Sequence, residues 1–276
     1  MIRRRKVIPG RAAAILVALL AFGPRSAVAD TIRISGIGGA AETIRRLGEA
    51  FRKVRPDVRF ALLPSIGGEG AVKAVVAGDL DIGLCARPLT GEERAQGAVE
   101  TWYARTPLAF GVNRSVKTSG LTLASVVEIY AGKRNYWEDG SRIRLILRPP
   151  TDSDAPVLKR MSPEMHVAVG SALRRVGMTV AMTDDDLANA IEKTPGAFGA
   201  TTLALVLSEK RAIRLLALNG IVPSVRTLVD GSYPYSRTFF MVTRKHPPAA
   251  VRRFIDFVRS SAGASILAKN GQAAVR

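Results

Sequence analysis

Apolar positions along this chain form two kinds of pattern, short apolar runs and longer stretches with helical spacing. The stretch 41–54, for example, places Ile44, Leu47, Phe51 and Val54 on one helical face. The short runs predict strands at 31–35, 58–63, 81–86, 107–112, 143–147 and 239–242, with a strand or turn at 196–201. The spaced stretches predict helices at 41–54, 70–77, 123–130, 156–161, 163–176, 184–193 and 248–260. Strands that alternate with helices are typical of an α/β fold with a mostly parallel sheet.

Two glycine-rich turns each lie between a predicted strand and a predicted helix. The first contains Gly38, Gly39 and Ala40, and the second contains Gly67 and Gly68. Such turns leave the first N–H groups of a helix uncovered, at the positive end of the helix dipole. Because each helix start is then a seat for an anion, the pattern predicts a small anion held between converging helix ends.

A third helix start follows the strand predicted at 143–147. Ser153 and Asp154 stand just before Pro156, which is an ordinary helix start. Arg148 stands at the end of the strand, and its planar guanidinium can grip an oxyanion with two hydrogen bonds. Taken alone, this segment reads as a helix cap with a surface arginine. Beside the two glycine turns, it favours an anion-binding site.

Other kinds of site find little support in the sequence. Gly36-x-Gly38-x-x-Ala41 matches the loose dinucleotide fingerprint, but no acidic residue ends the second predicted strand to hold a ribose. Neither His166 nor His246 has a cysteine or a carboxylate nearby at the spacing typical of metal ligands. No serine, histidine and carboxylate stand in a recognisable catalytic order. We therefore expect neither an enzyme nor a cofactor.

The single cysteine and an acidic run narrow the choice further. Cys85 is the only cysteine, so no internal disulfide can form and a zinc site is disfavoured. The run 184–186 is three aspartates, which could be taken for a cation site. After Thr183 it reads better as a helix cap with acids in the first turn.

The N-terminus has the pattern of an export signal. A basic segment at 3–11 precedes an apolar run at 12–22, too short to span a bilayer, and then an A-x-A site that ends at Ala29. A retained N-terminal anchor is the alternative, and Arg3-Arg4 leaves Sec or Tat export open. Cleavage would remove six basic residues and lower the net charge from +18 to +12. This charge favours anionic ligands, while the scattered arginines and the few aromatics argue against nucleic-acid binding.

In order along the chain, these features resemble the periplasmic phosphate-type substrate-binding proteins of ABC importers, which have the type II periplasmic-binding fold. The matching segments are 64–70 with Lys73, 81–89, 123–133 with Asn135 and Trp137, 147–150 with 152–154, and 194–199. The resemblance implies two α/β lobes with mixed, mostly parallel sheets. Lobe one would comprise 30–105 and 238–276, and lobe two would comprise 106–237, with crossing strands at 106–113 and 235–243.

The resemblance also implies an oxyanion pocket built from helix-start amides, hydroxyls, a carboxylate acceptor and an arginine. The matching positions are Gly38, Gly39, Ala40, Gly67, Gly68, Glu69, Cys85, Ala86, Arg87, Arg148, Ser153, Asp154 and Ala155. The chain departs from the family pattern, since Gly68 replaces a serine, Ala86 the acidic acceptor and Ala155 a hydroxyl. Each lost hydrogen bond to a charged ligand costs roughly 1.5–3 kcal/mol. Glu69 could accept a proton from hydrogen phosphate or repel the ligand, and both interpretations stay open.

From this resemblance we expect an exported, monomeric periplasmic protein. It would capture a small inorganic oxyanion, phosphate first, by lobe closure and present it to an ABC permease in the inner membrane. The alternative is a degenerate binding-protein fold that acts as a periplasmic sensor or interaction module without transport, which the missing hydroxyls favour.

Overall fold

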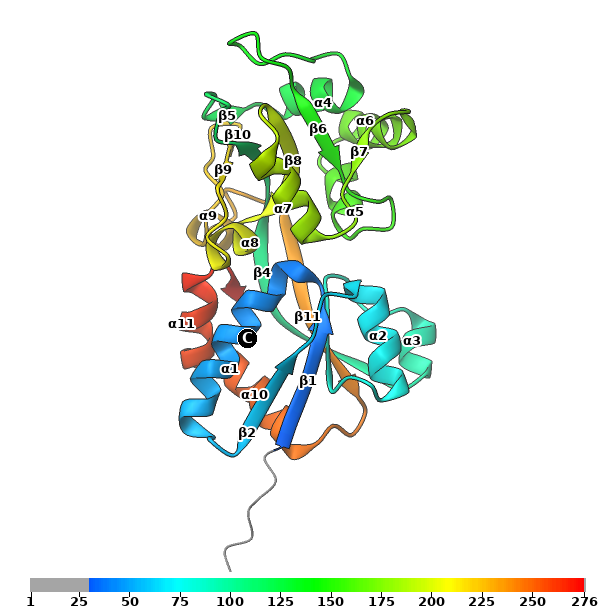
Figure 1. Cartoon of the computed structure of the whole chain (residues 1–276), viewed down its shortest axis with the longest axis vertical. Helices are drawn as coiled ribbons and strands as arrows, with labels where there is room; N and C mark the ends of the chain where they lie inside the picture. Colours follow the sequence, from blue (N-terminus) through cyan, green and yellow to red (C-terminus); the bar gives the residue numbers. More distant parts are fainter. Residues whose placement is uncertain (1–29, 276) are drawn as a thin grey trace, which may run out of the picture.

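The chain folds into two α/β lobes stacked along the long axis of the molecule and joined by two long strands, β4 (Ala98–Asn113) and β11 (Ser236–Arg244) (Figure 1). This computed structural model describes residues 30–275. The export signal expected at 1–29 lies outside the described residues. Within 30–275, no helix combines the length and the apolar character needed to cross a bilayer.

The lower lobe in Figure 1 is built on a sheet in which β1 (Asp30–Gly36) pairs in parallel with β2 (Val58–Leu62) and β3 (Ile82–Cys85), while β11 runs antiparallel to β3 and β4. Apolar side chains of α1 (Gly38–Val54), α10 (Ala249–Arg259) and α11 (Ser261–Lys269) pack on one face of this sheet. Those of α2 (Gly67–Ala77) pack in a separate cluster. The lobe is completed by α3 (Gly91–Ala95) and β12 (Ala273–Ala274).

The upper lobe continues the sheet from β4 to β8 (Ala197–Thr202), β6 (Arg144–Leu147) and β7 (Thr179–Val180). One core cluster lies under α4 (Leu123–Ala131), α5 (Asp154–Lys159) and α6 (Pro163–Arg174). Another lies under α7 (Asp184–Lys193) and α8 (Leu203–Ser208). The remaining short elements are β5 (Gly120–Leu121), β9 (Ile213–Leu215), β10 (Ala217–Leu218) and α9 (Val225–Val229).

The predicted α/β class with mixed sheets is confirmed, but several element bounds differ. The strand predicted at 107–112 is only the upper half of β4, whose lower half begins at Ala98. That half carries exposed and buried residues in irregular order, so its sequence lacks a strand period. It is a strand because β11 pairs with it along nearly its whole length. Likewise α1 starts at Gly38 and α2 at Gly67, each three residues earlier than predicted, because the glycines themselves form the first turns.

The two glycine turns lie side by side and are tied together. The Ser65 hydroxyl donates to the carbonyl of Gly36, and the Ser35 hydroxyl donates to that of Pro64, both at 2.6 Å. Gly36 has φ of +148°, and a Cβ there would lie 2.2 Å from the Leu84 carbonyl oxygen. Only glycine fits this approach of β1 to β3. The helix starts of α1 and α2 are thus held next to each other at the top of the lower lobe.

Candidate anion-binding cleft

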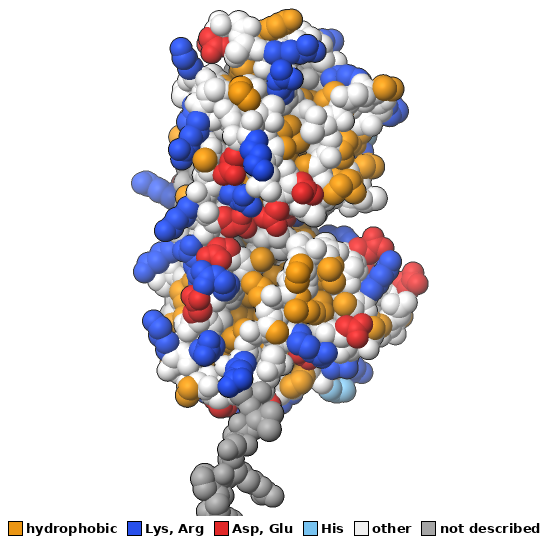
Figure 2. Space-filling model, in the orientation of Figure 1, with side chains coloured by type: hydrophobic (Ala, Val, Ile, Leu, Met, Phe, Trp, Pro, Cys, Tyr) orange, Lys and Arg blue, Asp and Glu red, His pale blue; other side chains and the backbone are white. Residues whose placement is uncertain are grey.

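A cavity of about 230 Å³ lies between the lobes, where the carboxyl ends of β1, β3 and β6 meet. From the lower lobe it is lined by 37–38, 65–70 and 85–87; from the upper lobe by 148–149, 151–153 and 182–184; and by Arg237 of β11. Ligand sites in open α/β sheets form at the carboxyl ends of strands. The space-filling view shows a hollow at this waist, with acidic side chains gathered near it (Figure 2).

The structure brings most of the sequence-predicted positions to this cavity. Its lining includes Gly38, Gly67, Gly68, Glu69, Cys85, Ala86, Arg87, Arg148 and Ser153. Four other predicted positions, Gly39, Ala40, Asp154 and Ala155, are outside the lining. All four are buried. Which of these residues contact a ligand stays a prediction.

The two charged residues predicted at the lower rim already have partners. Lys73 Nζ donates to Glu69 Oε1 at 2.8 Å, and the pKa of Glu69 is lowered by this bond and by the lysine charge. Arg87 binds Glu93 at 2.7 Å, and this bond lowers the pKa of Glu93 to about 2. The rim charges thus cancel in pairs.

Gly68 lies against the side chain of Cys85. A Cβ at Gly68 would lie 3.2 Å from Cys85 Sγ, which is tighter than an ordinary van der Waals contact. The buried thiol of Cys85 thus leaves little room for a side chain at position 68. Without one, the start of α2 can offer an anion only its backbone N–H groups.

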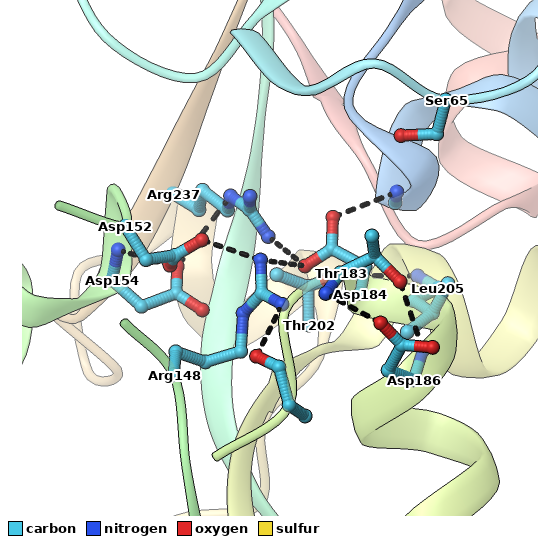
Figure 3. Close-up of polar contacts among 12 residues, drawn as sticks. Ser65, Arg148, Asp152, Asp154, Thr183, Asp184, Asp186, Thr202, Leu205 and Arg237 are labelled. Carbon is cyan, nitrogen blue, oxygen red and sulfur yellow. Dashed lines mark hydrogen bonds and ion pairs between the residues drawn. The ribbon is translucent and has the colours of Figure 1, made fainter. Parts of the chain in front are cut away.

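The floor of the cleft is a network of three aspartates and two arginines, of which Asp154, Asp184 and Arg237 are buried (Figure 3). Arg237, 2% exposed, donates from Nη1 to Asp184 Oδ1 at 2.8 Å, and its Nε lies 3.4 Å from Asp154 Oδ1. Arg148 Nη2 contacts Asp152 and lies 3.7 Å from Asp184 Oδ1. Its Nη1 donates to the Ala181 carbonyl at 3.0 Å. Arg148, which the sequence predicts to bind the anion, therefore already interacts with two carboxylates of the protein.

Asp184 links the two lobes. The Gly39 N–H, in the first turn of α1, donates to Asp184 Oδ2 at 2.9 Å although the residues are 145 positions apart. The cap of α7 is formed by its neighbours, since Thr183 Oγ1 accepts from the Asp186 N–H and the Asp186 carboxylate accepts from the Thr183 N–H. Asp184, Asp185 and Asp186 all lie in the first turn of α7 after the Thr183 cap, as the helix-cap interpretation predicts. The Asp184 side chain in addition crosses to the lower lobe (Figure 3).

The two buried aspartates beside Arg237 have opposite pKa shifts. Burial, with the Asp152 and Asp184 charges, raises the pKa of Asp154 to about 7 despite the attraction of Arg237. Neither Asp154 carboxylate oxygen accepts a hydrogen bond within residues 30–275. Burial also opposes ionisation of Asp184, but Arg237, Arg148 and the Gly39 N–H outweigh it and lower the pKa of Asp184. Asp184 is thus the ionised partner of Arg237.

Arg237 was not predicted from the sequence, although one signal points to it. It stands two residues before the apolar run 239–242, and a charge in a buried strand needs a buried countercharge. The identity of that countercharge is not readable, because Asp184 is 53 residues away in sequence. No group of three or more histidine, cysteine, aspartate or glutamate side chains in the described part of the chain could hold a metal ion.

Two α/β lobes that enclose a cleft of charged side chains and helix starts define the architecture of a solute-binding protein. The chain matches the PBP superfamily domain over residues 24–262 and belongs to this superfamily. The sequence-based resemblance is therefore confirmed.

Individual relatives are more distant. The chain is 24% identical over 256 residues to the phosphate-binding protein PstS of Borreliella burgdorferi, covering 88% of this chain and 90% of that one. A putative phosphate ABC transporter substrate-binding protein from Clostridium perfringens, solved with bound phosphate, superposes with a TM-score of 0.75 at 23% identity, over 90% of this chain and all of that one. A phosphate-binding protein from Stenotrophomonas maltophilia gives 0.67 at 12% identity, over 89% and 91%. These structures share the two-lobed fold.

Proposed function

We propose that this protein is an exported solute-binding protein that captures a small oxyanion, phosphate first, between its lobes for an ABC importer. The observation that carries the proposal is the cleft, where the glycine starts of α1 and α2 face Arg148 and Ser153 across about 230 Å³. The superfamily and the phosphate-binding relatives support the same choice. The protein would act as a monomer in the periplasm after cleavage behind Ala29.

Capture would work by lobe closure. An anion in the cavity can accept hydrogen bonds from the α2 amides of the lower lobe and from Arg148 of the upper lobe. Both sets of bonds form only when the lobes are together, so the ligand shifts the population toward the closed form. The closed form is what a permease would distinguish from the empty protein.

A sensor or interaction module without transport is the second candidate. One observation favours it: the cleft arginines are already paired, Arg87 with Glu93, Arg148 with Asp152 and Arg237 with Asp184. A thermal-shift panel of phosphate, sulfate, molybdate and organic acids separates the two. Stabilisation by an inorganic oxyanion supports capture, and a flat panel supports the second candidate.

Arg148→Ala tests the cleft directly. A hydrogen bond to a charged group contributes roughly 1.5–3 kcal/mol, so we expect the variant to bind phosphate at least tenfold more weakly by calorimetry, with its fold intact. Arg160→Ala is the control, because Arg160 is exposed at the end of α5 in the same lobe. Equal affinity in the wild type and Arg148→Ala would remove Arg148 from the site.

A further inference from the structure

We propose that Asp184 is a tethered ligand: its carboxylate occupies the anion seat at the start of α1, and a solute anion takes that seat by displacing it. The inference rests on the proposed function and adds to it the state of the empty cleft. It concerns a residue that sequence patterns assign to a helix cap.

The donors around the Asp184 carboxylate are those expected around a bound oxyanion. Oδ2 accepts from the Gly39 N–H at 2.9 Å, in the first turn of α1, where the helix dipole is positive. Oδ1 accepts from Arg237 Nη1 at 2.8 Å, with Arg148 Nη2 at 3.7 Å. A backbone amide and two guanidinium groups thus surround one carboxylate, which is the arrangement in which proteins hold free anions.

The glycines of the α1 start leave room for this carboxylate. A Cβ at Gly39 would lie 3.1 Å from Asp184 Oδ2, and a Cβ at Gly38 would lie 3.1 Å from Asp185 Oδ2. Any larger residue would press on the aspartates, so the glycine turn and the acidic start of α7 are complementary. The turn predicted to receive an external anion receives an internal one.

Charge at the cleft floor leads to the same conclusion. Arg237 and Arg148 bring two positive charges, which Asp184 and Asp152 balance, while Asp154, whose pKa is raised to about 7 by burial, carries at most a partial negative charge near neutral pH. An entering oxyanion would therefore find no net positive charge at the cleft floor. The oxyanion can accept hydrogen bonds from the Gly39 N–H and from Arg237 only if the Asp184 side chain moves away from them, because two anions cannot share these donors.

Chemical rescue tests the seat without reference to the natural solute. Asp184→Ala leaves a carboxylate-sized space beside Arg237 and Gly39, so we expect a lowered melting temperature that millimolar formate raises by several degrees more than chloride of equal ionic strength. Wild type and Asp186→Ala, which removes a neighbouring carboxylate from the same turn, should respond to both salts alike. A formate response in Asp184→Ala no larger than in these controls would overturn the inference.

Phosphate calorimetry on Asp184→Asn, which keeps the side-chain size, gives the second readout and serves if the alanine variant does not fold. Removing the internal competitor should tighten phosphate binding at least tenfold. If the variant binds phosphate as tightly as wild type or more weakly, Asp184 either has no part in binding or contacts the phosphate directly. Either result would also overturn the inference. If neither protein binds phosphate, phosphate is not the solute, and the formate response alone decides the inference.

Discussion

Arg237 determines the arrangement of the cleft floor. Its guanidinium is almost fully buried and faces Asp184 and Asp154. Taking one partner from a buried ion pair costs about 3–5 kcal/mol, because the other charge is left without compensation. The upper-lobe aspartates are therefore held against a strand that both lobes share.

Asp154, which lies beside Arg237, makes the stability of the protein depend on pH. Its pKa of about 7 in the folded state lies above the ordinary 3.8, so between these pH values the folded protein holds a proton that the unfolded chain has lost. This contribution to the free energy of unfolding therefore falls as pH rises from about 4 to 7. The corresponding window of Asp184, whose pKa is lowered, lies below pH 3.8.

Asp154→Asn should remove this dependence, since an amide resembles the protonated carboxyl. Between pH 4.5 and pH 8, we expect the free energy of unfolding of the variant to improve relative to wild type by at least about 1.4 kcal/mol, the equivalent of one pKa unit. Guanidinium denaturation at both pH values measures it. Asp256→Asn, exposed on α10, is the control. A difference that does not change with pH would refute the protonated Asp154.

The starts of α1 and α2 determine where the cleft can bind an anion. They are held side by side by the crossed bonds of Ser35 and Ser65 and by the close approach of β1 to β3 at Gly36. The cleft depends on this support, because the helix amides can converge only if both turns keep their positions.

Gly36→Ala should break the support. Its Cβ would lie 2.2 Å from the Leu84 carbonyl oxygen at φ of +148°, so we expect a loss of about 3 kcal/mol or more and a melting temperature lower by roughly 6 °C or more. Gly91→Ala is the matched control, because nothing lies within 4 Å of a Cβ at Gly91. Equal melting temperatures for the two variants would show that β1 can move away from β3.

Elements with a local signal were predictable, and those that depend on partners were not. The helix 41–54 and the glycine turns follow from spacing and composition alone, and the structure contains them as α1 and the starts of α1 and α2. The lower half of β4 has no period of its own and owes its strand geometry to β11. Because glycine usually marks a helix boundary, both predicted helices begin three residues later than α1 and α2.

At the scale of the whole molecule, the site also combines features with a local sequence signal and features that depend on residues far apart in the sequence. The position of Arg148 and of the glycine turns at the cavity could be predicted because each is a local pattern at a strand end. The pairing of Asp184 with Gly39 and Arg237 was not, since it joins segments 145 and 53 residues apart. Only the folded chain shows that the predicted anion seat faces a carboxylate of the opposite lobe.

The two lobes also contact each other along α1, beyond its first turn. There α1 faces α8, and Arg46 Nη2 donates to the Ser208 carbonyl at 2.6 Å. The lobes are therefore joined by β4 and β11, by this hydrogen bond and by the bond between Gly39 and Asp184.

A crystal structure of the protein grown with phosphate tests the account most directly. We expect phosphate in the cavity, bound by the α2 amides at Gly67 and Gly68, by Arg148, and by the Gly39 N–H and Arg237 donors that the Asp184 carboxylate has left. An empty cavity at saturating phosphate, or phosphate bound only outside the cleft, would contradict it.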